Sequence, residues 1–164
     1  MLLLGDSDRG ALDALLQRFG LRLEDVAADE AIPGSFWGDE EAGLIGNRLL
    51  ARADTPVHSI FHEGCHYICM DHSRRENLHT NAGGGYDEEN AVCYLQILLA
   101  DHLPDMGRAR MWADMDAWGY RFRLGSARAW FKRDAEDALA WLRRRGLVDD
   151  QGRITWALNM ETTT

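Results

Sequence analysis

The stretch His62-Glu63-Gly64-Cys65-His66 constrains this chain more than any other part of its sequence. Its pattern, H-E-x-x-H, places two histidines four residues apart, so on a helix both imidazoles point the same way, about one turn apart. Two imidazoles in that arrangement can occupy two corners of a tetrahedral zinc site. Glu63 follows the first histidine directly. Its carboxylate is therefore expected beside a bound metal, where it can act as general base on a water molecule.

The residues around the motif favour a helix from about 56 to about 70. Thr55 is a suitable N-cap, and Pro56 would then occupy the first helical position, where its missing N–H costs nothing. Apolar residues recur at helical spacing and give the helix a face to bury: Val57, Ile60, Phe61, Tyr67 and Ile68. Gly64 costs on the order of 1 kcal/mol relative to alanine, and it can let a neighbouring element approach closely.

Length and composition indicate one globular domain spanning residues 1–164. The chain is 46% hydrophobic and 27% charged, which suffices for a sizeable core. A net charge of −9 argues against a nucleic-acid surface, and no apolar run approaches the roughly 18 residues that cross a membrane. We therefore expect a cytoplasmic protein without nucleic-acid or membrane partners. The three cysteines are expected to be small buried hydrophobes in a reducing compartment.

The remaining pattern predicts an α+β fold, with a small sheet beside the motif helix and further helices after it. Two strands, 35–38 and 44–51, are expected to form a hairpin immediately before that helix. A polar loop is predicted over 71–86. The other predicted segments are a helix at 8–19, a short helix or turn at 21–31, and helices at 87–102, 110–118 and 127–145, the last ending at Gly146.

A catalytic zinc site usually has three protein ligands and one open position, so a third ligand is required. His72 is one candidate, because residues 62–72 match H-E-x-x-H-x-x-G-x-x-H at every position except one. Cys69 stands where that longer pattern has glycine, whose freedom lets the chain turn sharply and bring the third histidine back. A cysteine does not adopt positive φ without strain, so the sequence disfavours His72.

The second candidate is a glutamate from the next predicted helix, which begins with three acidic residues. Negative charge at a helix N-terminus complements the dipole and explains one or two of them. Helical phase places Glu88 on the most buried face, in line with Val92 and Leu95, while Glu89 is rotated by about 100°. A carboxylate on a buried face is costly unless it is paired or bound to metal. Glu88 is therefore the first choice for the third ligand and Glu89 the second.

Two histidines on one helix and a glutamate on the next resemble the arrangement in the gluzincins, zinc peptidases with a zincin-like fold. The second helix is also similar to the ligand helix of small metallopeptidases that inactivate phage-type repressors, although Ala91-Val92 stands where those enzymes carry Ala-Asn. The resemblance covers about residues 36–99. It implies one Zn²⁺ ion, a peptide or protein substrate lying along Leu44–Leu50, and peptide hydrolysis with Glu63 as the base.

Other polar residues are candidates for supporting roles. A donor to the substrate oxyanion is expected from Tyr86, His79 or His58, which the sequence does not rank. Gln96 and Asp71 are candidates for orienting the ligand histidines.

Two alternatives to an enzyme are compatible with the sequence. One is a catalytically silent zincin-like domain that binds zinc for structure, regulation or partner recognition. Glu63 argues against it, because a structural zinc site has no use for a base. The other is a metal-free helical protein in which the H-E-x-x-H string is accidental. The sequence makes no prediction of oligomeric state.

Overall fold

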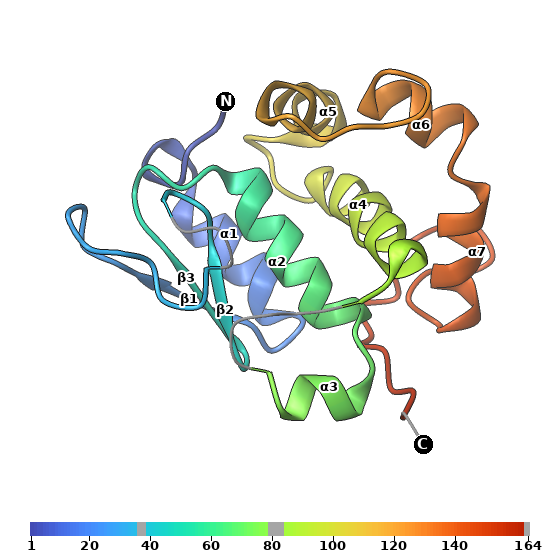
Figure 1. Cartoon of the computed structure of the whole chain (residues 1–164), viewed down its shortest axis with the longest axis horizontal. Coiled ribbons are helices and arrows are strands. Elements are labelled where there is room, and N and C mark those ends of the chain that lie inside the picture. The colour runs from blue at the N-terminus through green and yellow to red at the C-terminus, as the bar shows by residue number, and fades with distance from the viewer. Residues whose placement is uncertain (36–38, 79–83, 163–164) are drawn as a thin grey trace.

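The structure is a computed structural model and describes residues 1–35, 39–78 and 84–162. Its helices are the 3-10 turn η1 (Leu4–Asp6) and α1 (Arg9–Gln17), α2 (Val57–Cys69), α3 (His72–Glu76), α4 (Tyr86–Ala100), α5 (Gly107–Trp118), α6 (Ala127–Arg133) and α7 (Glu136–Arg144). A small sheet lies on one side of α2, and α4 lies on the other, followed by the later helices (Figure 1). The α+β class expected from the sequence is confirmed.

The sheet has the strand order β1–β3–β2, with β1 (Arg22–Asp25) parallel and β2 (Gly43–Ile45) antiparallel to the central β3 (Arg48–Ala51). β2 and β3 form a tight hairpin, so the prediction of one unbroken strand in this region is wrong. The turn between them contains Gly46 with a φ of +59°, a conformation that glycine adopts without steric cost. The other predicted strand, 35–38, falls almost wholly outside the described residues.

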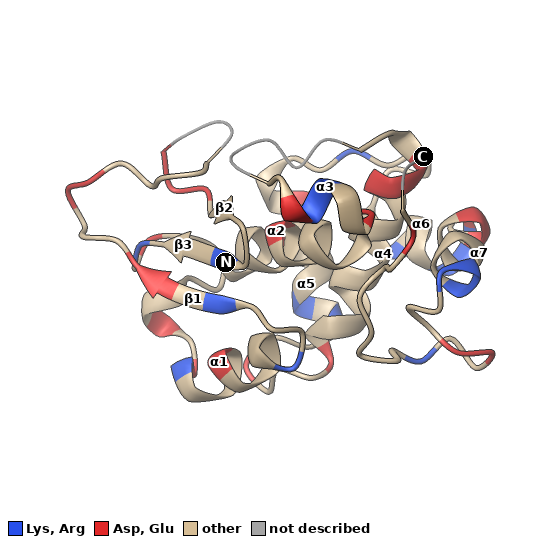
Figure 2. Ribbon diagram, turned by 90° about the horizontal axis from the view of Figure 1, so that it is seen from below, with Lys and Arg blue, Asp and Glu red and all other residues tan. Residues whose placement is uncertain are grey.

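β1 is a strand where the sequence predicts a short helix or turn over 21–31. Three of its four residues are charged, so their pattern does not indicate a strand. β3 and its flanking turn supply the partners: Arg22 N–H donates to Asn47 O at 2.9 Å, and Val26 N–H donates to Ala51 O at 2.8 Å. Figure 2 shows the charged residues along β1, an outer strand, where charge discourages pairing with another chain.

α2 lies within one residue of the predicted bounds and packs against the sheet and α4. Its N-cap is Pro56, with a φ of −65°, rather than Thr55. The Thr55 hydroxyl accepts a backbone N–H from the preceding turn at 2.9 Å and caps nothing in α2. Gly64 faces the sheet. A Cβ added there would lie 3.5 Å from Leu21 and 3.6 Å from Leu49, which are ordinary van der Waals distances.

The helix predicted over 127–145 is divided into α6 and α7. The chain leaves helical geometry at Asp134 and Ala135, whose φ angles are −139° and −116°. α6 packs on α5 and α7 packs on α4, so the two halves follow different neighbours. Each half buries its own tryptophan, Trp130 in α6 and Trp141 in α7.

α3 occupies the start of the predicted 71–86 loop and ties the C-terminal segment to the end of α2. Arg75 donates to Tyr67 O at 2.9 Å and to Asn159 O at 2.7 Å. Asn159 Nδ2 donates in turn to Cys69 O at 2.8 Å. These bonds satisfy carbonyl groups that the C-terminus of a helix leaves without intrahelical partners.

The three cysteines are buried and free, as expected. Burial raises the pKa of the Cys65 and Cys69 thiols, so neither is a thiolate near neutral pH. Across the described part of the chain, no helix combines the length and the apolar character needed to cross a membrane.

Candidate metal centre

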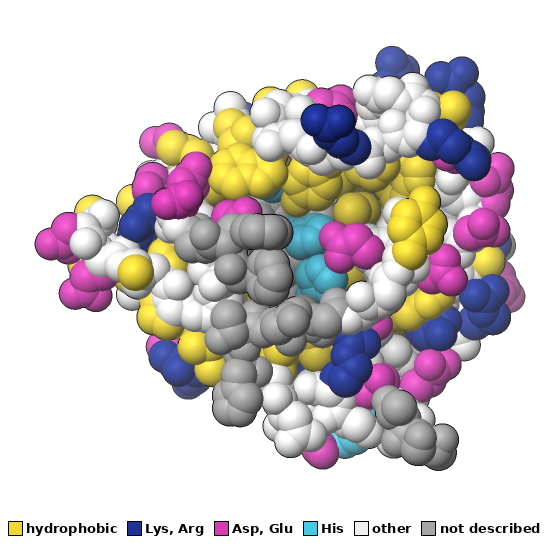
Figure 3. All heavy atoms as spheres, viewed as in Figure 1, with side chains coloured by type: hydrophobic (Ala, Val, Ile, Leu, Met, Phe, Trp, Pro, Cys, Tyr) yellow, Lys and Arg dark blue, Asp and Glu magenta, His cyan; other side chains and the backbone are white. Residues whose placement is uncertain are grey.

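Two helices bring three side chains of metal-ligating type together. His62 and His66 lie one turn apart on α2, and Glu89 lies in the first turn of α4, which packs against α2. Glu89 Oε1 lies 2.9 Å from His62 Nε2, and Glu89 Oε2 lies 2.9 Å from His66 Nε2. One potential ligand atom of each residue lies within 4.8 Å of the other two. Figure 3 shows histidine side chains in a hollow of this face, beside an acidic side chain.

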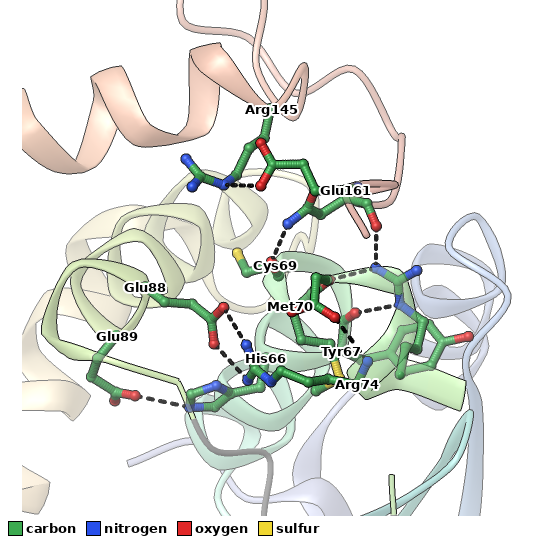
Figure 4. A network of polar contacts seen from close by, with 12 residues as sticks. His66, Tyr67, Cys69, Met70, Arg74, Glu88, Glu89, Arg145 and Glu161 are labelled. Carbon is green, nitrogen blue, oxygen red and sulfur yellow. Dashed lines mark hydrogen bonds and ion pairs between the residues drawn. The ribbon is translucent and has the colours of Figure 1, made fainter. Parts of the chain in front are cut away.

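Glu88, the first choice from the sequence, points to a different partner. Its carboxylate pairs with both terminal nitrogens of Arg74, at 2.8 and 2.9 Å, whereas Glu89 contacts His66 (Figure 4). Helical phase did predict a buried position, since the Glu88 side chain is 9% exposed against 48% for Glu89. However, an arginine stabilises a buried carboxylate as a metal does. The structure therefore brings Glu89, the second choice from the sequence, to the two histidines, and it pairs Glu88, the first choice, with Arg74.

His72 lies outside this cluster. α2 ends at Cys69, the chain is extended at Met70, and His72 begins the separate helix α3. Its imidazole pairs with Glu76 at 3.0 Å. Within the described residues, the longer three-histidine pattern therefore has no geometric support.

Gln96 lies on α4, two turns after Glu89, and contacts His62. Its Oε1 lies 2.9 Å from His62 Nδ1, and its Nε2 donates to His58 O at 3.0 Å. Because the amide nitrogen is engaged by a carbonyl, the amide oxygen faces the imidazole. In its neutral form, His62 then carries its proton on Nδ1 and directs the Nε2 lone pair toward Glu89. This contact matches the orienting role predicted for Gln96. Asp71, the other candidate for that role, lies at the N-cap of α3.

The clustered side chains alter one another's protonation. Burial by itself would raise the pKa of Glu89, but hydrogen bonds from His62 and His66 lower it far below its ordinary value. Burial likewise acts to lower the pKa of His62, yet Tyr120, Cys93 and Glu89 together raise it well above its ordinary value. Without a metal, the cluster is thus a carboxylate held by a protonated imidazole. A divalent cation would take the place of that proton, because it binds neutral imidazoles.

Glu63 is half-buried on α2 and forms no hydrogen bond or ion pair with any described residue. Burial raises its pKa; the neighbouring His62 and His66 act to lower it, and Glu89 acts to raise it. The net result is a carboxylate whose pKa is raised and whose oxygens have no partner in the described part of the chain. Such a group is suited to accept a proton and return it.

Tyr120 is a residue of the site that the sequence reasoning missed. Its hydroxyl lies 3.2 Å from His58 Nδ1 and 3.3 Å from Gln96 Nε2, and its ring centroid lies 5.6 Å from that of His62. Burial raises the pKa of Tyr120 to about 12, so the hydroxyl stays protonated and can donate a hydrogen bond. Gly119, with a φ of +110°, ends α5 immediately before it. No spacing in the sequence relates this tyrosine to the motif.

The three donors predicted from the sequence lie in different surroundings. His58 is fully buried against Trp118, with ring centroids 5.0 Å apart. Burial, and then the nearby His62, lower the pKa of His58 to about 3, so it is neutral at physiological pH. Tyr86 is 82% exposed at the first residue of α4. His79 lies outside the described residues.

The donor set suits zinc. Two imidazole nitrogens and one carboxylate are ligand types of catalytic zinc sites, and they leave one tetrahedral position open. With metal–ligand bonds of about 2.0–2.2 Å, tetrahedral ligand atoms lie about 3.4 Å apart, near the 2.9 Å separations between Glu89 and the histidines. His66 Nδ1 is buried and has no hydrogen-bond partner among the residues that the structure describes. The orientation of His66 therefore depends on what its Nε2 binds.

The sheet offers a peptide less room than the gluzincin resemblance implies. β3 is the central strand and is paired on both sides, so no peptide can add along residues 48–51. β2 is an outer strand, yet Leu44 N–H already donates to Gly34 O at 3.2 Å. Along the predicted substrate path Leu44–Leu50, β3 therefore has no free edge for pairing with a peptide, and the N–H of Leu44 on β2 is already engaged.

No protein-family model, curated protein or solved structure matches this chain. The gluzincin resemblance and the zincin-like fold therefore stay predictions from the sequence. The case for a metal centre rests on the geometry of the three side chains.

Proposed function

We propose that this protein is a zinc-dependent hydrolase of peptides, with His62, His66 and Glu89 as metal ligands and Glu63 as general base. The observation that carries the proposal is the meeting of three ligand side chains, His62, His66 and Glu89, beside a second carboxylate, that of Glu63, which has no hydrogen-bond or ion-pair partner among the described residues. A site that only held a metal would need no such base. The choice of zinc follows from the donor set, and the choice of peptides follows from the H-E-x-x-H motif and its resemblance.

Each side chain has a defined role in this proposal. Zinc bound at the site would supply positive charge that polarises a carbonyl and lowers the pKa of a water molecule. Glu63 accepts the proton of the attacking water and delivers it to the leaving amine. Tyr120 donates a hydrogen bond to the substrate oxygen that gains negative charge. Gln96 holds His62 so that Nε2 faces the other ligands.

Glu63→Gln tests the proposal. We expect the variant to retain zinc, measured by mass spectrometry of the purified protein, because Glu63 is not a ligand. Hydrolysis of a mixture of quenched fluorescent peptides should fall at least about 100-fold, the usual contribution of a general base. Glu76→Gln changes an exposed glutamate on α3 and should preserve both zinc and activity.

Two results would contradict this assignment. Loss of zinc from Glu63→Gln would make Glu63 a ligand rather than a base. Wild-type protein that contains no zinc, and whose stability a chelator leaves unchanged, would exclude every metal-dependent role.

A second candidate function is a catalytically silent zinc-binding domain that acts in regulation or partner binding. It is favoured by the bond between Leu44 N–H and Gly34 O, which takes part of the outer edge of β2 away from a peptide. In that case the wild-type protein would hold zinc and be stabilised by it. Neither the wild type nor Glu63→Gln would then hydrolyse any peptide of the mixture.

A further inference from the structure

A polar cavity is lined by chain neighbours of two residues of the candidate metal centre, Glu89 and Tyr120. Its volume is about 310 Å³, and its lining comes from the first turns of α4, the residues after Tyr120 and the link between α6 and α7. On α4, Tyr86 lies about one turn before Glu89 and Asn90 directly follows it, and after α5 Arg121 directly follows Tyr120. The volume lies at the lower end of the range of about 300–1,000 Å³ for ligand pockets. The cavity and the candidate metal centre share the start of α4 and the segment after α5.

Aromatic rings form part of the lining. Phe122 stacks on Trp130, with centroids 4.8 Å apart and an angle of 25° between the planes. Tyr86 also lines the cavity and is 82% exposed, so it gains little from packing within the fold. Hydrophobic side chains gather beside the hollow that holds the histidines in Figure 3. Aromatic faces of this kind attract cations as well as apolar groups.

The charges of the lining are unbalanced toward the negative. Arg123 is engaged by Asp134 in an ion pair, which leaves Arg121 as a cation without an ion pair among the described residues. Three further carboxylates of the lining form no ion pair with any described residue: Asp87, Glu136 and Asp137. The cavity thus combines aromatic surface with an excess of unpaired negative charge.

We propose, on the basis of the proposed function, that this cavity binds a lysine or arginine side chain of the peptide substrate. The aliphatic stem and the cationic head lie along Phe122 and Tyr86, and the head is stabilised by the carboxylates around it. An acidic side chain would be repelled by the same carboxylates. The net charge of −9 also favours a cationic peptide, because it attracts such a peptide toward the protein.

Nα-acetyl-arginine amide and its citrulline counterpart test the cavity, because citrulline has nearly the same shape without the charge. Both are titrated into the full-length protein, with the backbone amides of 134–138 and the Trp130 indole followed by NMR. We expect the arginine compound to bind at least about threefold more tightly than the citrulline compound, as an exposed ionic contact allows. Arg121→Gln should strengthen binding of the arginine compound, since it removes a repelling cation.

Two variants test whether the carboxylates of the cavity cause the preference for arginine over citrulline. The double variant Glu136→Gln, Asp137→Asn should reduce the difference between the two compounds. Asp150→Asn makes the same kind of change at an exposed carboxylate outside the cavity, and it should preserve that difference. Equal binding of the two compounds would overturn the proposal, as would shifts confined to other parts of the molecule. A double variant that discriminates as well as the wild type would also overturn it.

Peptides with arginine, citrulline or glutamate beside the scissile bond separate this proposal from the catalytic one. Binding of the arginine compound without hydrolysis of any peptide would contradict the proposed function and support the cavity's ligand class. If peptides are hydrolysed without a preference for arginine, and the arginine compound does not bind, only the proposed ligand of the cavity is contradicted.

Discussion

Glu88 and Glu89 are neighbours on α4 and make entirely different contacts, because successive residues of a helix point about 100° apart. Glu88 turns toward Arg74, and Glu89 turns toward His62 and His66. Burial alone does not distinguish the two roles, since either an arginine or a metal stabilises a buried carboxylate. What decides is the residue that faces each glutamate from α2 or α3.

Glu89→Gln and Glu88→Gln should separate metal binding from stability. We expect Glu89→Gln to weaken zinc binding at least about tenfold, because it removes the charged ligand. Glu88→Gln should leave zinc affinity unchanged and lower the free energy of unfolding by about 2 kcal/mol, since Arg74 loses a charged partner. Competition with a fluorescent chelator measures the first effect, and urea unfolding of zinc-free protein measures the second. Similar zinc affinities of the two variants would refute the assignment of Glu89.

His58 predicts a specific pH dependence of stability. Its pKa is about 3 in the folded protein, lowered by burial and then by His62, against an ordinary value of 6.5. Between about pH 3 and pH 6.5, His58 therefore binds a proton in the unfolded chain but not in the folded protein. The His58 contribution is fully present above pH 6.5, and it is lost as the pH falls, by about 1.4 kcal/mol per pH unit.

His58→Phe isolates this contribution. The variant keeps a ring against Trp118 but has no group to protonate, so its free energy of unfolding should fall less steeply below pH 6.5. Urea unfolding of zinc-free wild type and variant from pH 7.5 to 4.5 measures the difference in slope. Parallel curves would show that His58 is accessible to protons in the folded state.

At the scale of elements, predictions succeed where the pattern is local and strong. The apolar repeat of α2 predicts its bounds within one residue, and Gly146, with a φ of +71°, ends the last helix as expected. The predictions failed for β1 and for the break between α6 and α7. A charged tetrapeptide becomes a strand because β3 lies beside it, and the break exists because α6 and α7 pack on different helices. Neither cause is visible in the local sequence.

Gly64→Ala should stabilise α2. The added Cβ meets Leu21 and Leu49 at ordinary contact distances, so alanine gains helix propensity without a clash. We expect the free energy of unfolding of zinc-free protein to rise by about 0.5–1 kcal/mol, with zinc affinity unchanged. Gly46→Ala is the contrasting control. Residue 46 has a φ of +59°, which alanine adopts only with strain, so the free energy of unfolding of this variant should fall by about 1 kcal/mol. Destabilisation by Gly64→Ala would mean that α2 and the sheet approach more closely than described.

At the scale of the whole molecule, Arg75 joins segments that are distant in the sequence. It is 8% exposed and donates to Met70 O at 2.8 Å as well as to Tyr67 O and Asn159 O. The C-terminal segment adds its own bond, from Asn159 N–H to Ile68 O at 2.9 Å. The end of the helix that carries His62 and His66 is thereby fixed by residues near the C-terminus.

Arg75→Gln should destabilise the fold strongly. Removing the guanidinium leaves several buried carbonyl oxygens without donors, and we expect a loss of about 3 kcal/mol in the free energy of unfolding. The control is Arg153→Gln, because the Arg153 side chain is 76% exposed. The free energy of unfolding of this variant should fall by less than about 1 kcal/mol. Urea unfolding of the zinc-free variants measures both. Equal losses would show that the bonds of Arg75 add nothing beyond a surface contact.

By itself, the sequence determined the motif helix, the pair of histidines on it and the glutamate beside them. These features depend on periodicity within a few turns of one helix, which local residues control. Only the tertiary structure decided that Glu89 rather than Glu88 meets the histidines, that the Tyr120 ring meets His62 edge-to-face, and that the residues next to Glu89 and Tyr120 line a cavity. Those contacts join residues far apart in the chain, and their free energy is gained only when α2, α4 and the segment after α5 pack together.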